Sequence, residues 1–342
     1  MSDRIQALRA ARGWSQAELA RRAGVTRQLV GAVEAGRHTP NVSAALGLAE
    51  ALATTVEALF APSNAQVVDV LGIQQPAGTP VRTSRVGDRL IAVPDEHRIA
   101  GPEAWAMADA VTGADGLTWL PGGSAAEVLI AGCDPILGVL SGLVERTGHR
   151  MLGVHASTGR AVQALAEGRA HGVLVHGPRR DLPPPPVPVR RWRVGCWQVG
   201  LGAPKAKGLA PSIDELATRR AKVVQRDAGA GTQRALVRAL RDAGAQPDLP
   251  GPLGTGHLDV ARRVAYGGVA AGVLMEAAAL AFDLPFTPLE QHSVELWVAL
   301  EWVTLPATIA LLEALASEAL VARSRLLGGY DTTGCGDEIL AG

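Results

Sequence analysis

The segment from Trp14 to Val33 limits the fold of this chain more than any other part, because it contains two helix starts separated by one tight turn. Ser15-Gln16-Ala17-Glu18 has the pattern of a capping box, in which the serine and glutamate side chains each bind the other residue's backbone N–H. Gly24 can take a positive φ and end that helix, and Thr26 can cap the next one. The sequence therefore predicts two short helices joined by a turn.

The second of these helices has a face suited to reading DNA. Helical spacing turns Val30 and Val33 inward and leaves Arg27 and Gln28 on the outer face beside two small residues, which let a helix approach base edges closely. Arginine and glutamine side chains match the guanine and adenine edges in the major groove. The pattern favours a helix-turn-helix.

The charge distribution supports a nucleic-acid partner at this end only. The whole chain of 342 residues has a net charge of zero, which by itself argues against binding to phosphates. Residues 1–40, however, contain seven arginines against three acidic residues, a local charge of +4. The basic part of the chain is its N-terminal segment.

These residues resemble a known family. WSQAELARRAGVTRQLVGAVEAGRHTP, closed by LAEAL and VEALF, is similar to the XRE/Cro-type helix-turn-helix over residues 3–60. The resemblance implies DNA contacts by Gln16, Thr26, Arg27, Gln28 and Arg37, with Gln16 on a phosphate or base edge and Arg37 on the backbone. Ala32 stands where some members carry a long polar reader, so base readout is expected to be sparse. The alternative is a helical bundle that contacts only protein.

The middle of the chain predicts a small β extension. Residues 61–66 have the composition of a linker, and VVDVLG, PVRTSRVGDRLIAVP and GLTWL have the pattern of short strands with a turn at Gly87-Asp88. No function follows from this pattern, although a dimer contact or a cap on the larger domain would both suit it.

From Glu127 onward, apolar runs alternate with helical stretches, which favours a parallel sheet covered by helices. A βαβαβ unit ends at HGVLVHG, and after a proline-rich break a second set of strands and helices repeats the scheme, with another capping box at Ser212-Ile213-Asp214-Glu215. The predicted fold is multidomain: an all-α helix-turn-helix domain at 1–62, a linker and small β extension at 63–126, and a two-lobed α/β domain at 127–342.

The order of motifs in this last domain carries a second resemblance. AGCDPIL, ALAEGRAHGVLVHG, RDAGAGTQ, VAYGGVAAGVLMEAA and GGYDTTGCGDE follow one another as in substrate-binding-protein-like domains of the periplasmic-binding-protein type II, related to molybdate-binding proteins and LysR-type effector domains. The resemblance implies a small ligand held between the lobes by amides at helix N-termini, which favour polar or anionic groups. Molybdate, tungstate, a small organic acid, an amino acid and a sulfur compound all remain open.

Residues at the carboxyl ends of the strands are the candidates for ligand contact, because these ends meet at one crevice. They are Cys133, Asp134, Ser157, Thr158, Gly231, Thr232, Gln233, Tyr266 and Glu276. Each has a plainer interpretation. Asp134, Ser157 and Thr158 suit helix caps, Asp134 above all, and Cys133 suits a small buried residue.

The sequence predicts neither metal, cofactor nor catalysis. The three cysteines form no CxxC pair, and His155, His171 and His176 have no spacing typical of a ligand set, so packed or solvated histidines are expected. Walker A, GxSxG and HExxH motifs are absent.

We therefore expect a cytoplasmic, ligand-responsive transcription regulator that is not an enzyme. Its expected partners are double-stranded operator DNA and a small-molecule effector, with no membrane, in a homodimer or higher even oligomer. One alternative is an enzyme or ligand-handling protein of molybdenum cofactor metabolism with an accessory helix-turn-helix. Another is a module that docks protein through its N-terminal helices.

Overall fold

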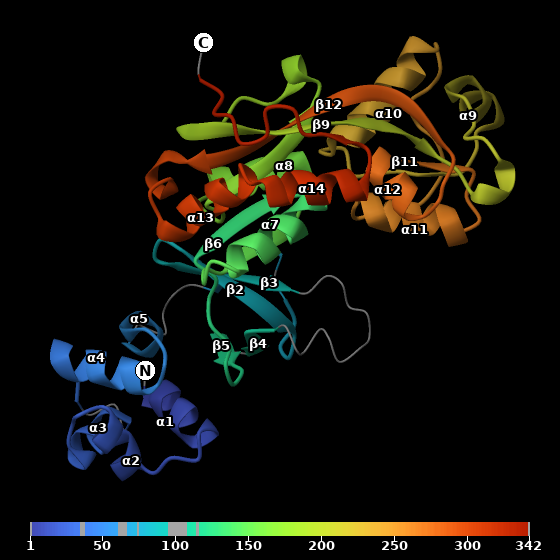
Figure 1. The fold of residues 1–342 in the computed structure, drawn as a ribbon. Helices are drawn as coiled ribbons and strands as arrows, with labels where there is room; N and C mark the ends of the chain where they lie inside the picture. Colours follow the sequence, from blue (N-terminus) through green and yellow to red (C-terminus); the bar gives the residue numbers. More distant parts are fainter. Residues whose placement is uncertain are drawn as a thin grey trace. The chain divides into compact units, whose positions relative to one another are not determined.

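The computed structural model describes residues 2–34, 38–60, 67–73, 75–94, 108–113 and 116–340. The chain divides into two compact units, one formed by residues 1–83 with 87–125 and the other by residues 84–86 with 126–342 (Figure 1). Each unit is described by itself.

The first unit begins with a bundle of short helices around its own apolar core. Ile5, Leu19, Val30 and Leu48 are fully buried in that core. The helices are α1 (Ser2–Ala11), α2 (Gln16–Arg22), α3 (Arg27–Glu34), α4 (Val42–Ala51) and α5 (Val56–Phe60).

The predicted helix ends of the bundle are confirmed, with one difference. Gly24 has a φ of 65°, and the Thr26 hydroxyl accepts the Leu29 N–H at 3.2 Å. Ser15 accepts the Glu18 N–H at 3.2 Å, but the Glu18 side chain pairs with Arg21 and Arg22 instead of returning to Ser15. The expected capping box is therefore only half formed, because two neighbouring arginines compete for the same carboxylate.

The β extension is a five-stranded sheet in the order β1-β3-β2-β4-β5. Its strands are β1 (Val67–Asp69), β2 (Pro80–Val86), β3 (Arg89–Pro94), β4 (Ala110–Gly113) and β5 (Gly116–Trp119). The predicted strands are present, and the short strand β4 pairs with β5 as a hairpin that the sequence pattern did not indicate.

The second unit is built on one curled mixed sheet with the strand order β10-β11-β9-β12-β8-β6-β7, and β13 pairs with β9. The strands are β6 (Val128–Gly132), β7 (Met151–His155), β8 (Gly172–Gly177), β9 (Val189–Gly202), β10 (Val223–Val224), β11 (Ala271–Met275), β12 (Phe286–Ala299) and β13 (Tyr330–Asp331). The helices are α7 (Ile136–Glu145), α8 (Thr158–Ala166), α9 (Ile213–Arg219), α10 (Gly231–Asp242), α11 (His257–Tyr266), α12 (Glu276–Ala281), α13 (Pro306–Leu315) and α14 (Glu318–Leu327).

Two lobes share this sheet. We call β6, β7 and β8 with α7, α8, α13 and α14 the first lobe, and β10 and β11 with α9 to α12 the second lobe. The paired strands β9 and β12 run along both lobes (Figure 1). Ser212 and Glu215 form the predicted capping box at the start of α9.

The expectation of a parallel sheet is wrong for the middle of the domain. β6 pairs in parallel with β7 and β8, and β10 with β11, but β9 and β12 are antiparallel to each other and to their outer neighbours. The chain crosses between the lobes once along β9 and once, in the opposite direction, along β12, so these two neighbouring strands pair antiparallel.

Candidate DNA-binding and ligand-binding sites

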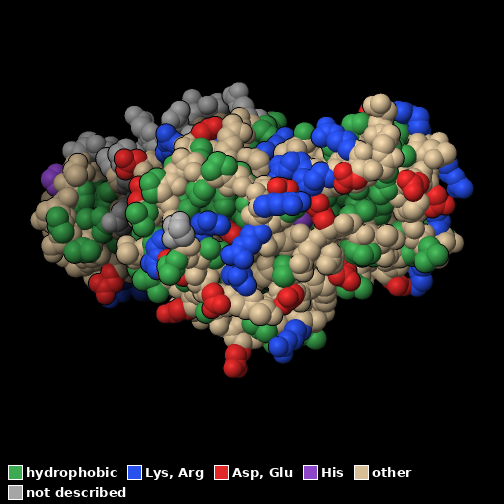
Figure 2. Space-filling model, turned by 90° about the horizontal axis from the view of Figure 1, so that it is seen from above, with side chains coloured by type: hydrophobic (Ala, Val, Ile, Leu, Met, Phe, Trp, Pro, Cys, Tyr) green, Lys and Arg blue, Asp and Glu red, His purple; other side chains and the backbone are tan. Residues whose placement is uncertain are grey.

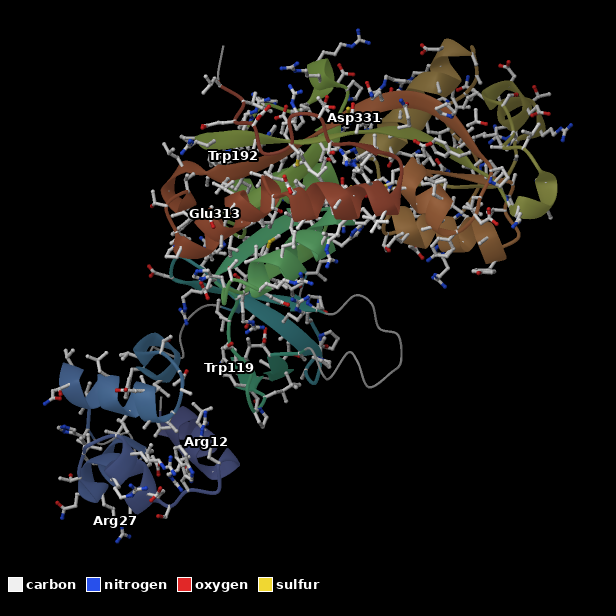
Figure 3. The ribbon with its side chains drawn as sticks, viewed as in Figure 1. Arg12, Arg27, Trp119, Trp192, Glu313 and Asp331 are labelled. Carbon is white, nitrogen blue, oxygen red and sulfur yellow. The ribbon has the colours of Figure 1, made fainter. Side chains whose placement is uncertain are left out.

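The outer face of α3 is the candidate DNA-contacting surface. Arg27 and Gln28 are exposed, whereas Val30 and Val33 are buried on the opposite side. Figure 3 shows Arg27 pointing away from the helices of its unit. Gln16, Arg27 and Gln28 line an open surface hollow together with Gly31 and Ala32, so the small residues do leave room beside the polar ones.

A buried ion pair fixes the amide of Gln16 at the rim of this hollow. The Arg9 guanidinium donates to the Glu34 carboxylate at 2.6 Å and 3.1 Å, and Gln16 Nε2 donates to the same carboxylate at 2.8 Å. Gln16 is thus positioned by α1 and α3 together. Thr26 is exposed at the start of α3 as its N-cap, and Arg37 lies outside the described residues.

The candidate ligand residues lie where the two lobes meet. Ser157 Oγ donates to Asp227 Oδ1 at 2.8 Å, the Gly159 N–H donates to the Gly229 carbonyl at 3.2 Å, and His155 Nε2 donates to the Thr255 carbonyl at 2.8 Å. Each of these bonds joins a residue at the end of β7 or the start of α8 to a loop of the second lobe. The lobes are therefore closed on each other in this structure.

Both carboxylate oxygens of Asp134 accept hydrogen bonds within the domain. Its carboxylate accepts from the Ile136 N–H at 2.9 Å, from Trp197 Nε1 at 2.9 Å and from the Tyr330 hydroxyl at 2.5 Å. Burial raises the pKa of this carboxyl, and the three donors oppose the rise. The N-cap residue of α7 is Pro135 and not Asp134 as expected, but the Asp134 carboxylate still accepts the first N–H of this helix and anchors Trp197 of β9 and Tyr330 of β13.

Arg226 is the opposite case, a buried cation with unused donors. Its side chain is 1% exposed, and one nitrogen, Nη2, donates to the Thr255 carbonyl at 3.2 Å. Among the described residues, Nε and Nη1 of Arg226 have no hydrogen-bond partner, and the same holds for the buried hydroxyls of Thr158 and Thr232. Buried donors without acceptors are costly, so this group suits an acceptor-rich ligand.

The other predicted contact residues divide into two sets. Gly231 lies against His176, and the Gln233 amide oxygen accepts the Arg226 N–H at 2.8 Å, so both help to shape the loop that carries Arg226.

Tyr266 is 82% exposed at the C-terminal end of α11, away from the strand ends. Glu276 begins α12 and lies beside Gly329. We therefore leave Tyr266 and Glu276 out of the site.

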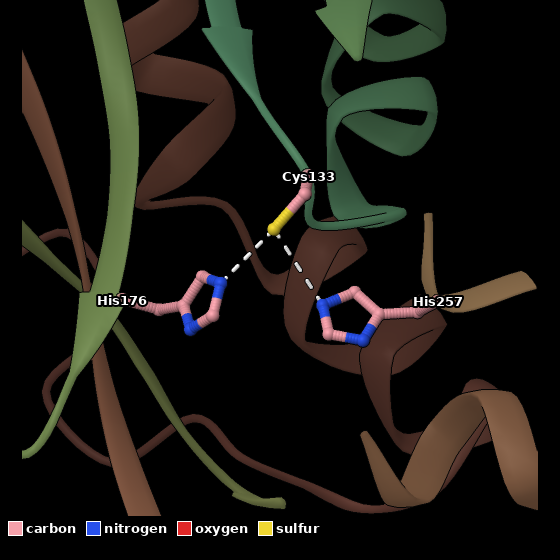
Figure 4. A group of neighbouring side chains, drawn as sticks. All are labelled: Cys133, His176 and His257. Atoms are coloured by element: carbon pink, nitrogen blue, oxygen red, sulfur yellow. Dashed lines mark hydrogen bonds between the residues drawn. The ribbon is translucent and has the colours of Figure 1, made fainter. Parts of the chain in front are cut away.

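A thiol and two imidazoles also meet at the lobe junction (Figure 4). Cys133 Sγ lies 3.0 Å from His176 Nε2 and 3.5 Å from His257 Nε2, and all three side chains are buried. Burial raises the pKa of the Cys133 thiol to about 11 and lowers the pKa of both histidines well below its usual value. The group is uncharged.

From the sequence, Arg226 is one of three arginines, with Arg160 and Arg234, that could compensate the acidic residues of the cleft, but neither Arg226 nor His257 is among the predicted contact residues, and His176 is expected to be a packed side chain. Arg226 is the second residue after the short strand β10, and His257 begins α11 after a glycine, so both occupy the kind of strand-end and helix-start positions used to select the other candidates. Positional reasoning would have included them had it been applied to β10 and α11 as it was to β6.

The rest of the surface carries both signs of charge. Figure 2 shows acidic and basic side chains interspersed on one face, and several arginines are in ion pairs, among them Arg190 with Glu338 and Arg238 with Glu290. Within the residues that the structure describes, no helix has both the length and the apolar character needed to cross a membrane.

Comparison with known proteins gives matches to both parts of the chain. A helix-turn-helix family model matches residues 5–59, and a PBP superfamily domain model matches residues 142–316, just over half of the chain. The chain is 38% identical over 60 residues, 18% of its length, to an uncharacterized HTH-type transcriptional regulator, YgzD, of Bacillus subtilis (strain 168), and covers 91% of that protein.

Solved structures with some similarity exist for each part. The restriction-modification controller protein C.AhdI from Aeromonas hydrophila is 39% identical, with 17% of this chain and 89% of that chain covered and a TM-score of 0.17. The effector binding domain of QuiR in complex with shikimate is 8% identical, with 58% and 97% covered and a TM-score of 0.43. From the family models and the curated relative, the chain belongs to the PBP superfamily and carries an XRE-type helix-turn-helix domain ahead of its PBP domain.

Proposed function

We propose that this protein is a transcription regulator that binds double-stranded operator DNA and responds to a small anionic effector. Residues 1–62 bind the DNA, residues 63–126 connect the parts, and residues 127–342 bind the effector. The observation that carries the proposal is the combination of an exposed Arg27–Gln28 face on α3 with a buried, partly unpaired Arg226 at the lobe junction.

The DNA contacts follow from the geometry of α3. Arg27 and Gln28 read base edges in the major groove, and Gln16 and Thr26 contact the DNA at the start of their helices. Arg37 binds the backbone. Because operators of this kind have two-fold symmetry, the protein acts as a homodimer or a higher even oligomer.

The effector is a small molecule with several acceptor oxygens. The unpartnered Nε and Nη1 of Arg226 point in different directions from the guanidinium, so they suit two separate acceptor atoms, and the Thr158 and Thr232 hydroxyls add further donors. Arg226 and the half-buried Arg234 are the cations of this region, and the carboxylate of Asp227, which is engaged by Ser157 and by the Gly229 N–H, offsets one of them. The remaining positive charge balances a monocarboxylate better than a doubly charged molybdate or tungstate.

The DNA part is tested by selecting duplexes from a random pool with the full chain. Arg27→Ala with Gln28→Ala should abolish enrichment of any sequence while the protein stays folded. Gln6→Ala, an exposed change on α1, is the matched control and should enrich the same sequences as the unaltered protein. Equal enrichment by the double variant would refute DNA reading by α3.

The effector part is tested by thermal unfolding of the full chain against small monocarboxylates, amino acids, molybdate and tungstate, since a ligand of the native state must raise the melting temperature. Arg226→Met should remove the shift that the active compound produces. It should leave the unliganded stability unchanged or higher, because it removes a buried charge with unpaired donors. A shift that persists in Arg226→Met would contradict the assigned site.

A further inference from the structure

Cys133, His176 and His257 come together from three separate elements. Cys133 follows β6, His176 lies on β8, and His257 opens α11, so the first two belong to the first lobe and the third to the second (Figure 4). Their ligand atoms, Sγ and two Nε2, all lie within 4.8 Å of one another, and the side chains are fully enclosed. A metal ion with bonds of about 2.0–2.3 Å fits between such atoms after small movements.

Hydrogen bonds behind His176 orient it as a ligand. Glu290 Oε1 accepts from His292 Nε2 at 2.6 Å, which leaves His292 Nδ1 to accept the proton of His176 Nδ1 at 2.8 Å. His176 therefore presents an unprotonated Nε2 to Cys133. A carboxylate that fixes the tautomer of a ligating histidine in this way is the usual support of a metal-binding imidazole.

The metal-free arrangement is a complete hydrogen-bond network of its own. His257 Nδ1 accepts the Met275 N–H at 3.2 Å, so its Nε2 carries the proton and donates to Cys133 Sγ, and the thiol donates to His176. For an ion to bind, the His257 ring proton must move to Nδ1 and the thiol proton must be released to solvent. The Met275 N–H then loses its acceptor and the two hydrogen bonds of the thiol are broken, so three metal bonds replace three hydrogen bonds.

We propose that Cys133, His176 and His257 bind a Cu(I) ion that joins the two lobes. A thiolate with two imidazoles is a soft, trigonal ligand set of the kind that Cu(I) accepts. The charges select the same ion, because Cu(I) and one thiolate cancel, whereas Zn²⁺ would leave a positive charge in a buried site next to the Arg226 cation. Arg226 of the proposed effector site lies beside this cluster, but the three ligands are different residues, and the proposal does not depend on the identity of the effector.

The full-length protein tests the proposal by anaerobic titration with Cu(I) against bicinchoninate, a chelator whose colour reports the Cu(I) that it retains. The unaltered protein should withdraw one Cu(I) per chain and unfold at a higher temperature afterwards, because the ion bridges the lobes. Cys196→Ser, a change of a half-buried cysteine outside the cluster, is the matched control and should bind equally.

Cys133→Ser should weaken binding by more than about 100-fold, and Glu290→Gln, which weakens the support of His292 and also removes the ion pair with Arg238, by about 10–100-fold. His257→Gln provides a second ligand variant, and circular dichroism checks that each variant folds. The proposal is overturned if the unaltered protein leaves all Cu(I) with the chelator, if Cys133→Ser binds as the unaltered protein does, or if Zn²⁺ displaces stoichiometric Cu(I). None of these readouts involves DNA or the effector.

Discussion

Single residues at the lobe junction differ in whether their polar atoms are satisfied. Asp134 has three donors for its carboxylate and serves the fold, whereas Arg226 keeps two nitrogens without acceptors and is the residue proposed to bind the effector. Both residues stand at strand ends, so sequence position alone could not separate them. Only the partners contributed by distant segments, such as Trp197 and Tyr330, make the distinction.

His171 makes the stability of the second unit depend on pH. Its Nδ1 accepts the Leu129 N–H at 3.0 Å, its ring packs edge-on against Trp302, and burial lowers its pKa to about 4. Between about pH 6.5 and pH 4 the unfolded chain takes up this proton and the folded chain does not, so stability is present above pH 6.5 and is lost as the pH falls. The contribution of His171 reaches about 3 kcal/mol.

His171→Asn isolates this contribution, because asparagine can accept the same N–H but does not titrate in this range. We expect denaturant unfolding between pH 7 and pH 4 to show a smaller loss of stability in the variant than in the unaltered protein. His176, His257 and His292, whose pKa values are also lowered by burial, contribute to the remaining loss. Parallel stability curves for the two proteins would contradict the assignment.

At the scale of elements, helix α4 approaches the end of α2 through a glycine. A side chain at Gly47 would place its Cβ 2.3 Å from the Ala23 carbonyl oxygen. Gly47→Ala should therefore destabilise the helix-turn-helix domain by about 1–3 kcal/mol, because backbone would have to move.

Gly138→Ala is the matched change, since Gly138 also lies within a helix and a Cβ there meets nothing within 4 Å. We expect it to stabilise the protein by about 0.5–1 kcal/mol through the better helix propensity of alanine. Thermal unfolding followed by circular dichroism measures both. Equal shifts of the melting temperature in the two variants would show that the close approach of α4 to α2 does not require a glycine at position 47.

The elements of the helix-turn-helix domain could be predicted because their signals are local. Gly24 and Thr26 mark a turn and a cap within a few residues, and the structure has both. The pairing of β9 with β12 could not be predicted in this way, since it joins residues about a hundred positions apart. The equally non-local pairing of β12 with β8 places His292 behind His176, which explains why the histidine cluster could not be recognised from the sequence pattern.

The capping boxes show how local signals fail. Ser15-Glu18 and Ser212-Glu215 have the same spacing, but only the second pair forms both hydrogen bonds. The Glu18 carboxylate accepts hydrogen bonds from Arg21 and Arg22, and these bonds lower its pKa to about 2. A motif of four residues does not include the arginines that decide its outcome.

For the whole molecule, the proposed function requires that DNA and effector affect each other's binding. Coupling between two binding sites is reciprocal, and typical values correspond to about a 5–150-fold change in affinity. The closed lobe junction, with Ser157 bound to Asp227, is one of the two states between which an effector would shift the domain.

The most direct test is the affinity of the full chain for its selected duplex, measured by fluorescence anisotropy with and without a saturating amount of the compound that stabilises the protein. We predict a change of at least about fivefold in either direction, absent in Arg226→Met. An affinity for DNA that is the same at every effector concentration, in a protein that demonstrably binds both, would contradict the account of this chain as a ligand-responsive regulator.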